Sequence, residues 1–366
     1  MQRIVEQAMS IDVDFSLALN DRTGKLFLGK DIISTLGGQV SRVRYGRWHE
    51  FPHSDLMRRV VGRLTHKETL ARVYRSPFAA VLPVIRDPRP TLHLDPLSVV
   101  RHRLEPRDIV LCHDVGPITH PQYFAPGVDD LYLRAYDQIR RVKPHMVFVS
   151  KTSQQEFHRL YGCDFASSKV IYIPTRLGVK DGEAKAVDGV GARFLLTVGS
   201  VGDRKNQARC IEAFAASRLA QQGWQYVVVG GREPGADTAI NLAQQTPGVV
   251  LPGYTTDEQL RWLYRNASGF VLMSLLEGFG MPVIEAIEHD LPCLVSRSSI
   301  LTEVGGDAML DADPLELESI AMGMQALAAM PADERQRRID QARRHLQIFA
   351  REPILACWRE LIERMG

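Results

Sequence analysis

The fold is decided by the stretch Glu277–Ala286, which reads EGFGMPVIEA. It follows an apolar run over 269–274 that predicts a strand, and Pro282 favours the start of a helix directly afterwards. Glycines at 278 and 280 let the backbone approach a ligand closely, and the N–H groups of a helix start attract a phosphate. The order of strand, glycine-rich turn and helix therefore predicts an α/β unit with an anion site at the carboxyl end of its sheet.

Two carboxylates frame this turn. Glu277 is expected in the loop and Glu285 in the first turn of the helix, so that both face one crevice. Carboxylates there are natural acceptors for the hydroxyl groups of a sugar. Taken alone, each residue has an equally good structural interpretation, in which Glu285 complements the helix dipole and Glu277 is solvated.

A second stretch with the same order is Leu195–Gln207, which reads LLTVGSVGDRKNQ. A buried strand runs into a loop that places Arg204 and Lys205 at a helix start. Two cations at the positive end of a helix dipole are unfavourable unless an anion, such as a diphosphate, neutralises them. The alternative is a pair of solvated loop cations.

Outward from these two stretches, short apolar runs alternate with segments of helical period, which predicts an α/β protein with parallel sheets. Strands are expected at 11–19, 40–45, 108–112, 146–150, 170–173, 194–199, 225–230, 249–251, 269–274 and 292–296, and helices at 30–36, 207–219, 257–266 and 282–289. The helix at 257 has the capping-box spacing in Thr255 and Glu258. The tail from 334 to 366 reads as a basic amphipathic helix broken by Pro353.

The pattern divides the chain into two Rossmann-like, doubly wound domains, expected to face each other across a cleft. The expected boundaries are 1–176 for the N-terminal domain, 177–192 for a linker and 193–348 for the C-terminal domain, with a helix over 349–366 that packs back across the junction.

Composition excludes several classes of protein. The 366 residues are 45% hydrophobic and 24% charged, which is typical of globular proteins and excludes disordered, collagen-like and coiled-coil chains. A net charge of +2 argues against a nucleic-acid partner. The five cysteines are scattered and form no C-x-x-C, so neither a disulfide framework nor a zinc site is indicated, and a cytoplasmic location is expected.

Further motifs identify a family. Besides the two loops, these are Gly253-Tyr254 before a D-E-x-L helix, Glu303–Ala308 (EVGGDA) and His113–Phe124 (HDVGPITHPQYF). Together they resemble the retaining glycosyltransferases of family 4, which have the GT-B fold. The motifs of the first half look like those of bacterial members that add mannose or a deoxyhexose to surface polysaccharides. The resemblance covers essentially the whole chain and is weakest over 47–104.

The resemblance implies roles for individual residues. Arg204 and Lys205 would hold the donor diphosphate, Glu285 the ribose hydroxyls and Glu277 those of the transferred sugar, while His113 would contact the sugar from the other domain. The implied donor site comprises Gly199, Ser200, Arg204, Lys205, Gly230, Gly231, Tyr254, Glu277, Gly278, Phe279, Gly280, Met281 and Glu285. Thr23, Gly24 and Lys25 would lie on the acceptor side. Ser200 is a departure, because many members have an arginine there.

No cofactor and no metal are expected, since basic side chains and a helix dipole take the place of a metal in the enzymes that this chain resembles. Two D-x-D tripeptides, Asp12–Asp14 and Asp311–Asp313, are not interpreted as metal sites, because neither adjoins the diphosphate loop.

The resulting hypothesis is transfer of a hexose from a nucleotide sugar, with GDP-mannose as the leading donor, to a hydroxyl of a lipid-linked or polysaccharide acceptor. GDP- or dTDP-linked rhamnose and UDP-glucose remain open as donors. A sugar-nucleotide epimerase or hydrolase of the GT-B fold, and an inactive nucleotide-sugar-binding scaffold, are the alternatives.

The basic segment 56–75 carries Leu56, Val60 and Leu64 on one stripe of a predicted helix. It is interpreted either as a peripheral contact with the cytoplasmic face of the inner membrane or as an ordinary solvated cationic face. No run of about 18 apolar residues, the length of a membrane span, occurs in the chain.

Overall fold

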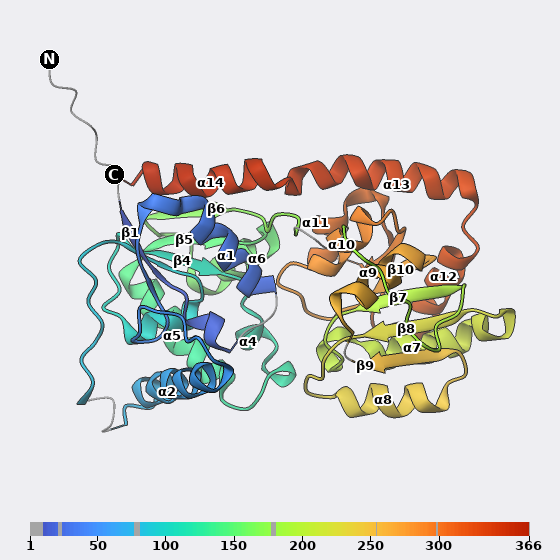
Figure 1. Cartoon of the computed structure of the whole chain (residues 1–366), viewed down its shortest axis with the longest axis horizontal. Helices are drawn as coiled ribbons and strands as arrows, with labels where there is room; N and C mark the ends of the chain where they lie inside the picture. Colours follow the sequence, from blue (N-terminus) through green and yellow to red (C-terminus); the bar gives the residue numbers. More distant parts are fainter. Residues whose placement is uncertain are drawn as a thin grey trace, which may run out of the picture. The chain divides into compact units, whose positions relative to one another are not determined.

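Two six-stranded parallel sheets organise the chain (Figure 1). The computed structural model describes residues 10–20, 24–76, 81–176, 181–253, 255–297 and 299–365. The described residues up to Pro174, together with those from Arg351 onward, form the N-terminal unit, and Thr175–Ala350 contains the C-terminal unit. None of the described helices is long and apolar enough to cross a membrane.

The sheet of the N-terminal unit has the strand order β2-β1-β3-β4-β5-β6, with parallel pairing throughout. Its strands are β1 (Ile11–Asp14), β2 (Val40–Arg44), β3 (Thr91–His93), β4 (Ile109–Cys112), β5 (His145–Phe148) and β6 (Ser167–Val170). Its helices are α1 (Gly24–Leu36), α2 (Asp55–Val73), α4 (Gly116–Thr119), α5 (Val128–Val142), α6 (Lys151–Tyr161) and α14 (Arg351–Glu363). The last of these, red in Figure 1, contacts α1 and forms an ion pair with it, Arg351 to Asp31 at 2.8 Å.

The sheet of the C-terminal unit has the order β12-β11-β10-β7-β8-β9. Its strands are β7 (Phe194–Val198), β8 (Gln225–Val229), β9 (Val249–Gly253), β10 (Gly269–Leu272), β11 (Cys293–Ser296) and β12 (Leu310–Ala312). Its helices are α7 (Gln207–Ser217), α8 (Ala236–Gln245), α9 (Asp257–Asn266), α10 (Met281–Glu288), α11 (Ile300–Gly305), α12 (Leu317–Ala328) and α13 (Ala332–Leu346). Counted along the chain from β7, this is the Rossmann order 3-2-1-4-5-6, with its switch point between β7 and β10.

Each sheet is buried beneath helices. In the C-terminal unit, one face of β7 and β10 packs against apolar side chains of α7 and α12, such as Phe214 and Met324, which are fully buried. In the N-terminal unit, β4 and β5 pack against Tyr136 of α5 and Phe157 of α6, also fully buried. Strands covered on both faces carry nearly continuous apolar runs, which is why the sequence pattern revealed most of them.

Several local predictions about strands are corrected. The strand expected over 11–19 ends at Asp14, because the Asp14 carboxylate accepts a hydrogen bond from the Ser16 N–H (3.0 Å) and Ser16–Leu19 continues as the 3-10 turn η1. The strand expected at 170–173 lies earlier, at Ser167–Val170. The three-residue strands β3 and β12 were not predicted, because they are too short to show a period.

Predictions about helix ends are corrected as well. The capping box of α9 is formed by Thr256 and Gln259, one residue later than expected. Since α10 begins at Met281, Glu285 lies in its second turn rather than its first. Pro353 lies in the first turn of α14, where its missing N–H is tolerated, and the helical tail is instead interrupted between α13 and α14.

Candidate functional site

Two loops of the C-terminal unit meet at the switch point of its sheet. The β7 loop (residues 199–206) follows β7, and the β10 loop (residues 273–280) follows the adjacent strand β10. The Leu275 N–H donates to the Arg204 carbonyl at 2.9 Å and joins the loops. Ligands of open α/β sheets usually bind at this position, and both predicted loops lie there.

The β7 loop is held in shape by its own backbone and by Gln207. The Gln207 side chain accepts from the Gly202 N–H (3.1 Å) and donates to the Ser200 carbonyl (2.9 Å). Gly230, at the end of β8, is required for close approach, because a Cβ there would lie 2.0 Å from the Gly199 carbonyl oxygen. Residues 199, 200 and 230, all predicted for the donor site, are therefore neighbours.

The two predicted cations and the predicted loop carboxylate form one cluster. Lys205 forms an ion pair with Glu277, and Arg204 Nη1 lies 3.6 Å from the other oxygen of this carboxylate. Ser274 Oγ donates to Glu277 at 2.8 Å. The side chains of Lys205 and Glu277 are only 8% exposed, so their attraction is little screened by water.

The charge state of Glu277 follows from these contacts. Burial alone would raise the pKa of Glu277, but the charges of Lys205 and Arg204 outweigh burial and lower it. Glu277 is therefore ionised at neutral pH and can only accept hydrogen bonds. That state suits recognition of hydroxyl groups and does not suit a general acid.

Glu233 belongs to the same cluster and was missed by the sequence analysis. Both of its oxygens lie 3.0 Å from Arg204 Nη2. Both cations expected to bind a diphosphate thus already have carboxylate partners, Glu233 and Glu277. The one sequence signal for Glu233 was its position shortly after the predicted strand β8 and Gly230-Gly231.

Glu285 lies in a separate buried contact within the same unit. Tyr264 Oη donates to Glu285 at 2.9 Å, and Arg176 Nη1 lies 3.8 Å from its other oxygen. Burial raises the pKa of Glu285, while Tyr264 and Arg176 oppose this shift. Tyr264, a residue of α9 that the sequence analysis did not single out as a site residue, thus contacts the predicted residue Glu285.

The remaining predicted residues lie at or just before the start of α10 and differ in their structural roles. Phe279 is 4% exposed and packs edge to face on Phe349. Its side chain is therefore part of the core. Gly280 caps α10 with a φ of +96°, and a Cβ there would also lie 2.4 Å from Leu301, so glycine is required. Gly278 lies in the β10 loop, and Met281 is the first residue of the helix.

A cavity of about 380 Å³ opens beside the β7 loop, within the range of roughly 300 to 1,000 Å³ usual for ligand sites. Its lining is mostly apolar side chains and glycine backbone, from Val201, Val228, Gly230, Arg232, Ile240, Ala243, Gln244, Val249, Leu251 and Gly253. Such a lining suits a flat aromatic ring that is recognised by backbone groups. Gly231 adjoins this lining, and Tyr254, also predicted here, lies outside the described residues.

The other predicted residues belong to the N-terminal unit. His113 directly follows β4 and is 5% exposed, with Nε2 2.9 Å from the Leu94 carbonyl oxygen. Gly24 begins α1, and Lys25 Nζ lies 3.7 Å from Asp95. Thr23 lies outside the described residues.

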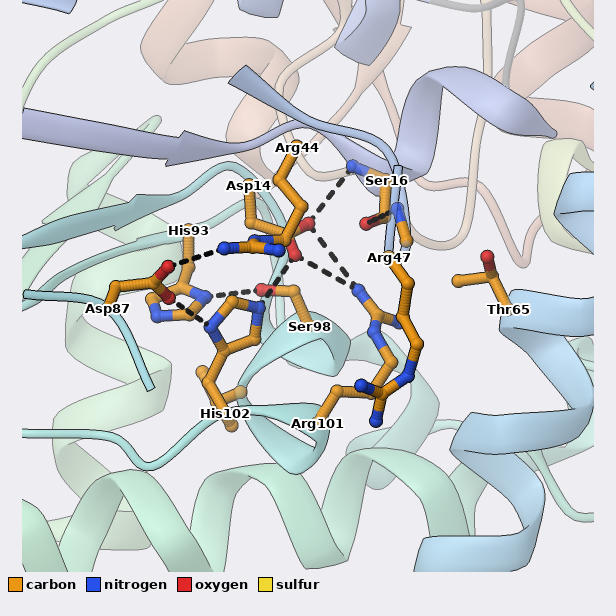
Figure 2. A network of polar contacts seen from close by, with 12 residues as sticks. Asp14, Ser16, Arg44, Arg47, Thr65, Asp87, His93, Ser98, Arg101 and His102 are labelled. Carbon is orange, nitrogen blue, oxygen red and sulfur yellow. Dashed lines mark hydrogen bonds and ion pairs between the residues drawn. The ribbon is translucent and has the colours of Figure 1, made fainter. Parts of the chain in front are cut away.

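The first D-x-D motif contributes to a buried polar network, shown in Figure 2. Asp14 lies 3.2 Å from Arg101 and 2.9 Å from His102 Nε2, while His102 Nδ1 lies 2.9 Å from Asp87. Arg44 binds the other oxygen of Asp87 at 2.6 Å. Asp14 is thus engaged by cationic side chains, and among the described residues no group of three or more His, Cys, Asp and Glu side chains is placed to hold a metal ion.

The network fixes the charge of His102. Burial would lower the pKa of His102, but its hydrogen bonds to Asp14 and Asp87 raise it above the usual value. Burial also lowers the pKa of the neighbouring His93 to about 3, and His102 adds to this shift. The geometry requires an N–H on both ring nitrogens of His102, because both face carboxylate oxygens.

Comparison with known proteins defines the class. Residues 183–345 match the family model described as glycosyl transferases group 1. This part of the chain contains the β7 and β10 loops and the cavity beside them.

Two relatives of similar sequence are named as O-antigen chain mannosyltransferases. The chain is 26% identical over 254 residues to O-antigen chain mannosyltransferase B of Escherichia coli, covering 65% of each chain. It is also 26% identical to O-antigen chain mannosyltransferase RfbU of Salmonella typhimurium, covering 61% of each. The chain thus spans less than two thirds of the length of these relatives.

Solved structures share the fold. Trehalose-6-phosphate synthase OtsA superposes with a TM-score of 0.68 at 12% identity, covering 97% of this chain and 99% of that one. Anabaena Alr3699/HepE, in a complex with UDP and glucose, has a TM-score of 0.66 at 16% identity, covering 97% and 100%. The fold is therefore GT-B, with two Rossmann-like units, as the sequence predicted.

Proposed function

We propose that this protein is a retaining hexosyltransferase of bacterial surface glycan synthesis, which transfers mannose from GDP-mannose to a hydroxyl of a lipid-linked or polysaccharide acceptor in the cytoplasm. The observation that carries the proposal is the cluster of Arg204, Lys205 and Glu277 at the switch point of the sheet, within the residues that match the group 1 glycosyltransferase model. The choice of mannose is supported by the names of the relatives, which are O-antigen mannosyltransferases.

In this proposal the donor diphosphate takes the place of carboxylates around Arg204 and Lys205. The two cations then stabilise the negative charge that develops on the departing diphosphate. Glu277, held ionised, accepts hydrogen bonds from hydroxyls of the transferred sugar, and Glu285 those of the ribose. The base occupies the cavity beside the β7 loop, which Gly230 and Gly253 line.

We propose that retention results from front-face attack, in which the acceptor oxygen approaches the anomeric carbon from the side on which the diphosphate leaves. The bond from the anomeric carbon to the diphosphate breaks, the bond to the acceptor oxygen forms, and the acceptor proton passes to a diphosphate oxygen. His113 is proposed to contact the transferred sugar, and Gly24, Lys25 and Thr23 to serve the acceptor. No metal is required, because Arg204, Lys205 and the start of α10 supply the positive charge.

Product analysis with and without acceptor tests the proposal. The chain is incubated in EDTA with GDP-mannose, GDP-rhamnose, dTDP-rhamnose or UDP-glucose and with a mannose-terminated lipid-linked acceptor, and the product is examined by NMR. Transfer from GDP-mannose with an α-linkage is expected. Donor conversion without acceptor would support an epimerase or hydrolase, and binding without conversion an inactive scaffold.

A further inference from the structure

Helix α2 exposes an apolar stripe that no described element covers. Leu56, Val60 and Leu64 are spaced four residues apart and are 73%, 47% and 46% exposed. Met57, beside them, is 55% exposed. Residues at this spacing lie above one another on one face of a helix, so the four side chains form a continuous surface.

A cationic stripe runs alongside it. Arg59, Arg63 and Lys67 repeat at the same spacing and are exposed, and no ion pair to them occurs among the residues that the structure describes. Like charges four residues apart repel each other, so this stripe is locally unfavourable until it meets an anion. Over 55–67 the one carboxylate is Asp55, which pairs with Arg58 at 3.2 Å.

The loop before α2 also exposes two aromatic rings. Trp48 and Phe51 are each 41% exposed. The loop is fastened to the helix, because Arg47 binds Glu68 through contacts of 2.7 and 2.9 Å. The rings are therefore held near the helix, and amphipathic aromatic rings are enriched where protein meets the membrane interface.

The opposite face of α2 is fully used within the N-terminal unit. It contacts α5 and the 3-10 turns η1 and η3 (Pro96–Arg101), and Val61 and Thr65 are buried there. Figure 1 shows α2 and α5 in the same unit. Glu68, also on the buried face, is paired with Arg47 and Arg72. The exposed stripes are thus not part of the packing that holds the helix in place.

We propose that this surface, formed by Leu56, Met57, Arg59, Val60, Arg63, Leu64 and Lys67, docks on an anionic lipid bilayer. The helix lies in the plane of the interface, its apolar stripe enters the boundary of the acyl chains, and its cations meet lipid phosphates. A solvent-exposed helix face usually carries charges of both signs. The exposed face of α2 instead combines an apolar stripe with the cationic stripe of Arg59, Arg63 and Lys67. The inference does not depend on the transfer reaction.

The test is co-sedimentation of the full chain with vesicles of neutral phosphatidylcholine, with or without 30% anionic phosphatidylglycerol. Two variants remove one stripe each, L56Q/V60Q/L64Q and R59Q/R63Q/K67Q. Matched controls remove three exposed apolar residues elsewhere, L315Q/M322Q/I348Q, or three exposed cations of α13, R337Q/R343Q/R344Q. Thermal melting of each variant verifies that it is folded.

We expect binding to anionic vesicles that weakens with salt, and a loss of at least tenfold in both stripe variants, with the controls unchanged. Equal loss in the controls, equal binding to neutral vesicles, or no binding at all overturns the inference. Self-association through the stripe, detected by sedimentation of the chain without vesicles and abolished in L56Q/V60Q/L64Q, overturns it as well. Transfer to a water-soluble acceptor, measured without vesicles, shows separately whether the proposed function holds.

Discussion

Glu233→Gln should tighten the binding of GDP. In the structure both oxygens of Glu233 hold Arg204 Nη2 at 3.0 Å, and a diphosphate that binds Arg204 has to compete with them. The amide keeps the shape of the side chain but removes its charge. The ligand then no longer displaces an ion pair, and its apparent affinity rises by the free energy of that pair.

The magnitude follows from the exposure of the two partners. The side chains of Arg204 and Glu233 are 19% and 30% exposed, so water and salt screen the pair. Exposed ion pairs contribute about 0 to 1 kcal/mol, and two charged hydrogen bonds place this pair at the upper end. One kcal/mol corresponds to a decrease of about fivefold in the Kd for GDP.

Isothermal titration calorimetry at fixed ionic strength measures this Kd. Glu318→Gln, an exposed carboxylate of α12, is the matched control, because it changes the net charge equally and should leave the Kd unchanged. In an Arg204→Ala background the effect of Glu233→Gln should vanish. Weaker GDP binding by Glu233→Gln would refute the reasoning, because it would mean that Glu233 positions Arg204 for the ligand.

Three further predictions concern other contacts. Lys205→Ala should lower kcat by about 10² to 10³ in a radiolabelled sugar transfer assay, because charge on the leaving diphosphate loses a buried partner. It should also lower Tm, because the buried Glu277 loses its ion-pair partner. Full activity would exclude the catalytic role. Tyr264→Phe should destabilise the fold by about 1 to 3 kcal/mol in urea denaturation, because it leaves the buried Glu285 without its hydroxyl donor, and an unchanged midpoint would contradict the contact. His102→Gln should lower the free energy of unfolding more at pH 6 than at pH 9.5. The pKa of His102 is raised in the folded state, so its protonated ring stabilises the fold at low pH. This contribution is lost as the pH rises through the folded-state pKa. Urea midpoints of His102→Gln and of the unchanged chain at pH 6 and pH 9.5 test this prediction. An equal difference between the two proteins at both pH values would show that His102 is neutral.

The cluster at the switch point could be predicted because adjacent parallel strands bring their carboxyl ends together. Lys205 and Glu277 are 72 residues apart, yet each follows a strand whose apolar run and glycine-rich turn are visible in the sequence. The order of the strands then makes the two loops neighbours. Patterns that follow from backbone periodicity and turn chemistry were thus sufficient to predict that these two loops are neighbours.

Contacts that depend on individual side-chain directions could not be predicted. No motif in the sequence singles out Glu233 or Tyr264 as a partner of a predicted site residue. The Asp14, His102 and Asp87 network joins residues 88 and 15 positions apart with no common motif. The exposure of Trp48 and Met57 also needed the structure, because composition alone does not show which face of α2 is covered.

The central claim is that the β7 and β10 loops form a nucleoside diphosphate site that works without metal. Its most direct test is thermal melting of the chain and of Lys205→Ala with GDP, UDP, dTDP or ADP, in EDTA and in magnesium. Binding to the native state at 100 times the Kd stabilises it by about 2.7 kcal/mol, so the shift is measurable. We predict a rise in Tm with GDP that is equal in EDTA and smaller in Lys205→Ala. No shift with any of the four nucleotides at millimolar concentration, or a shift unaffected by the substitution, would contradict the claim.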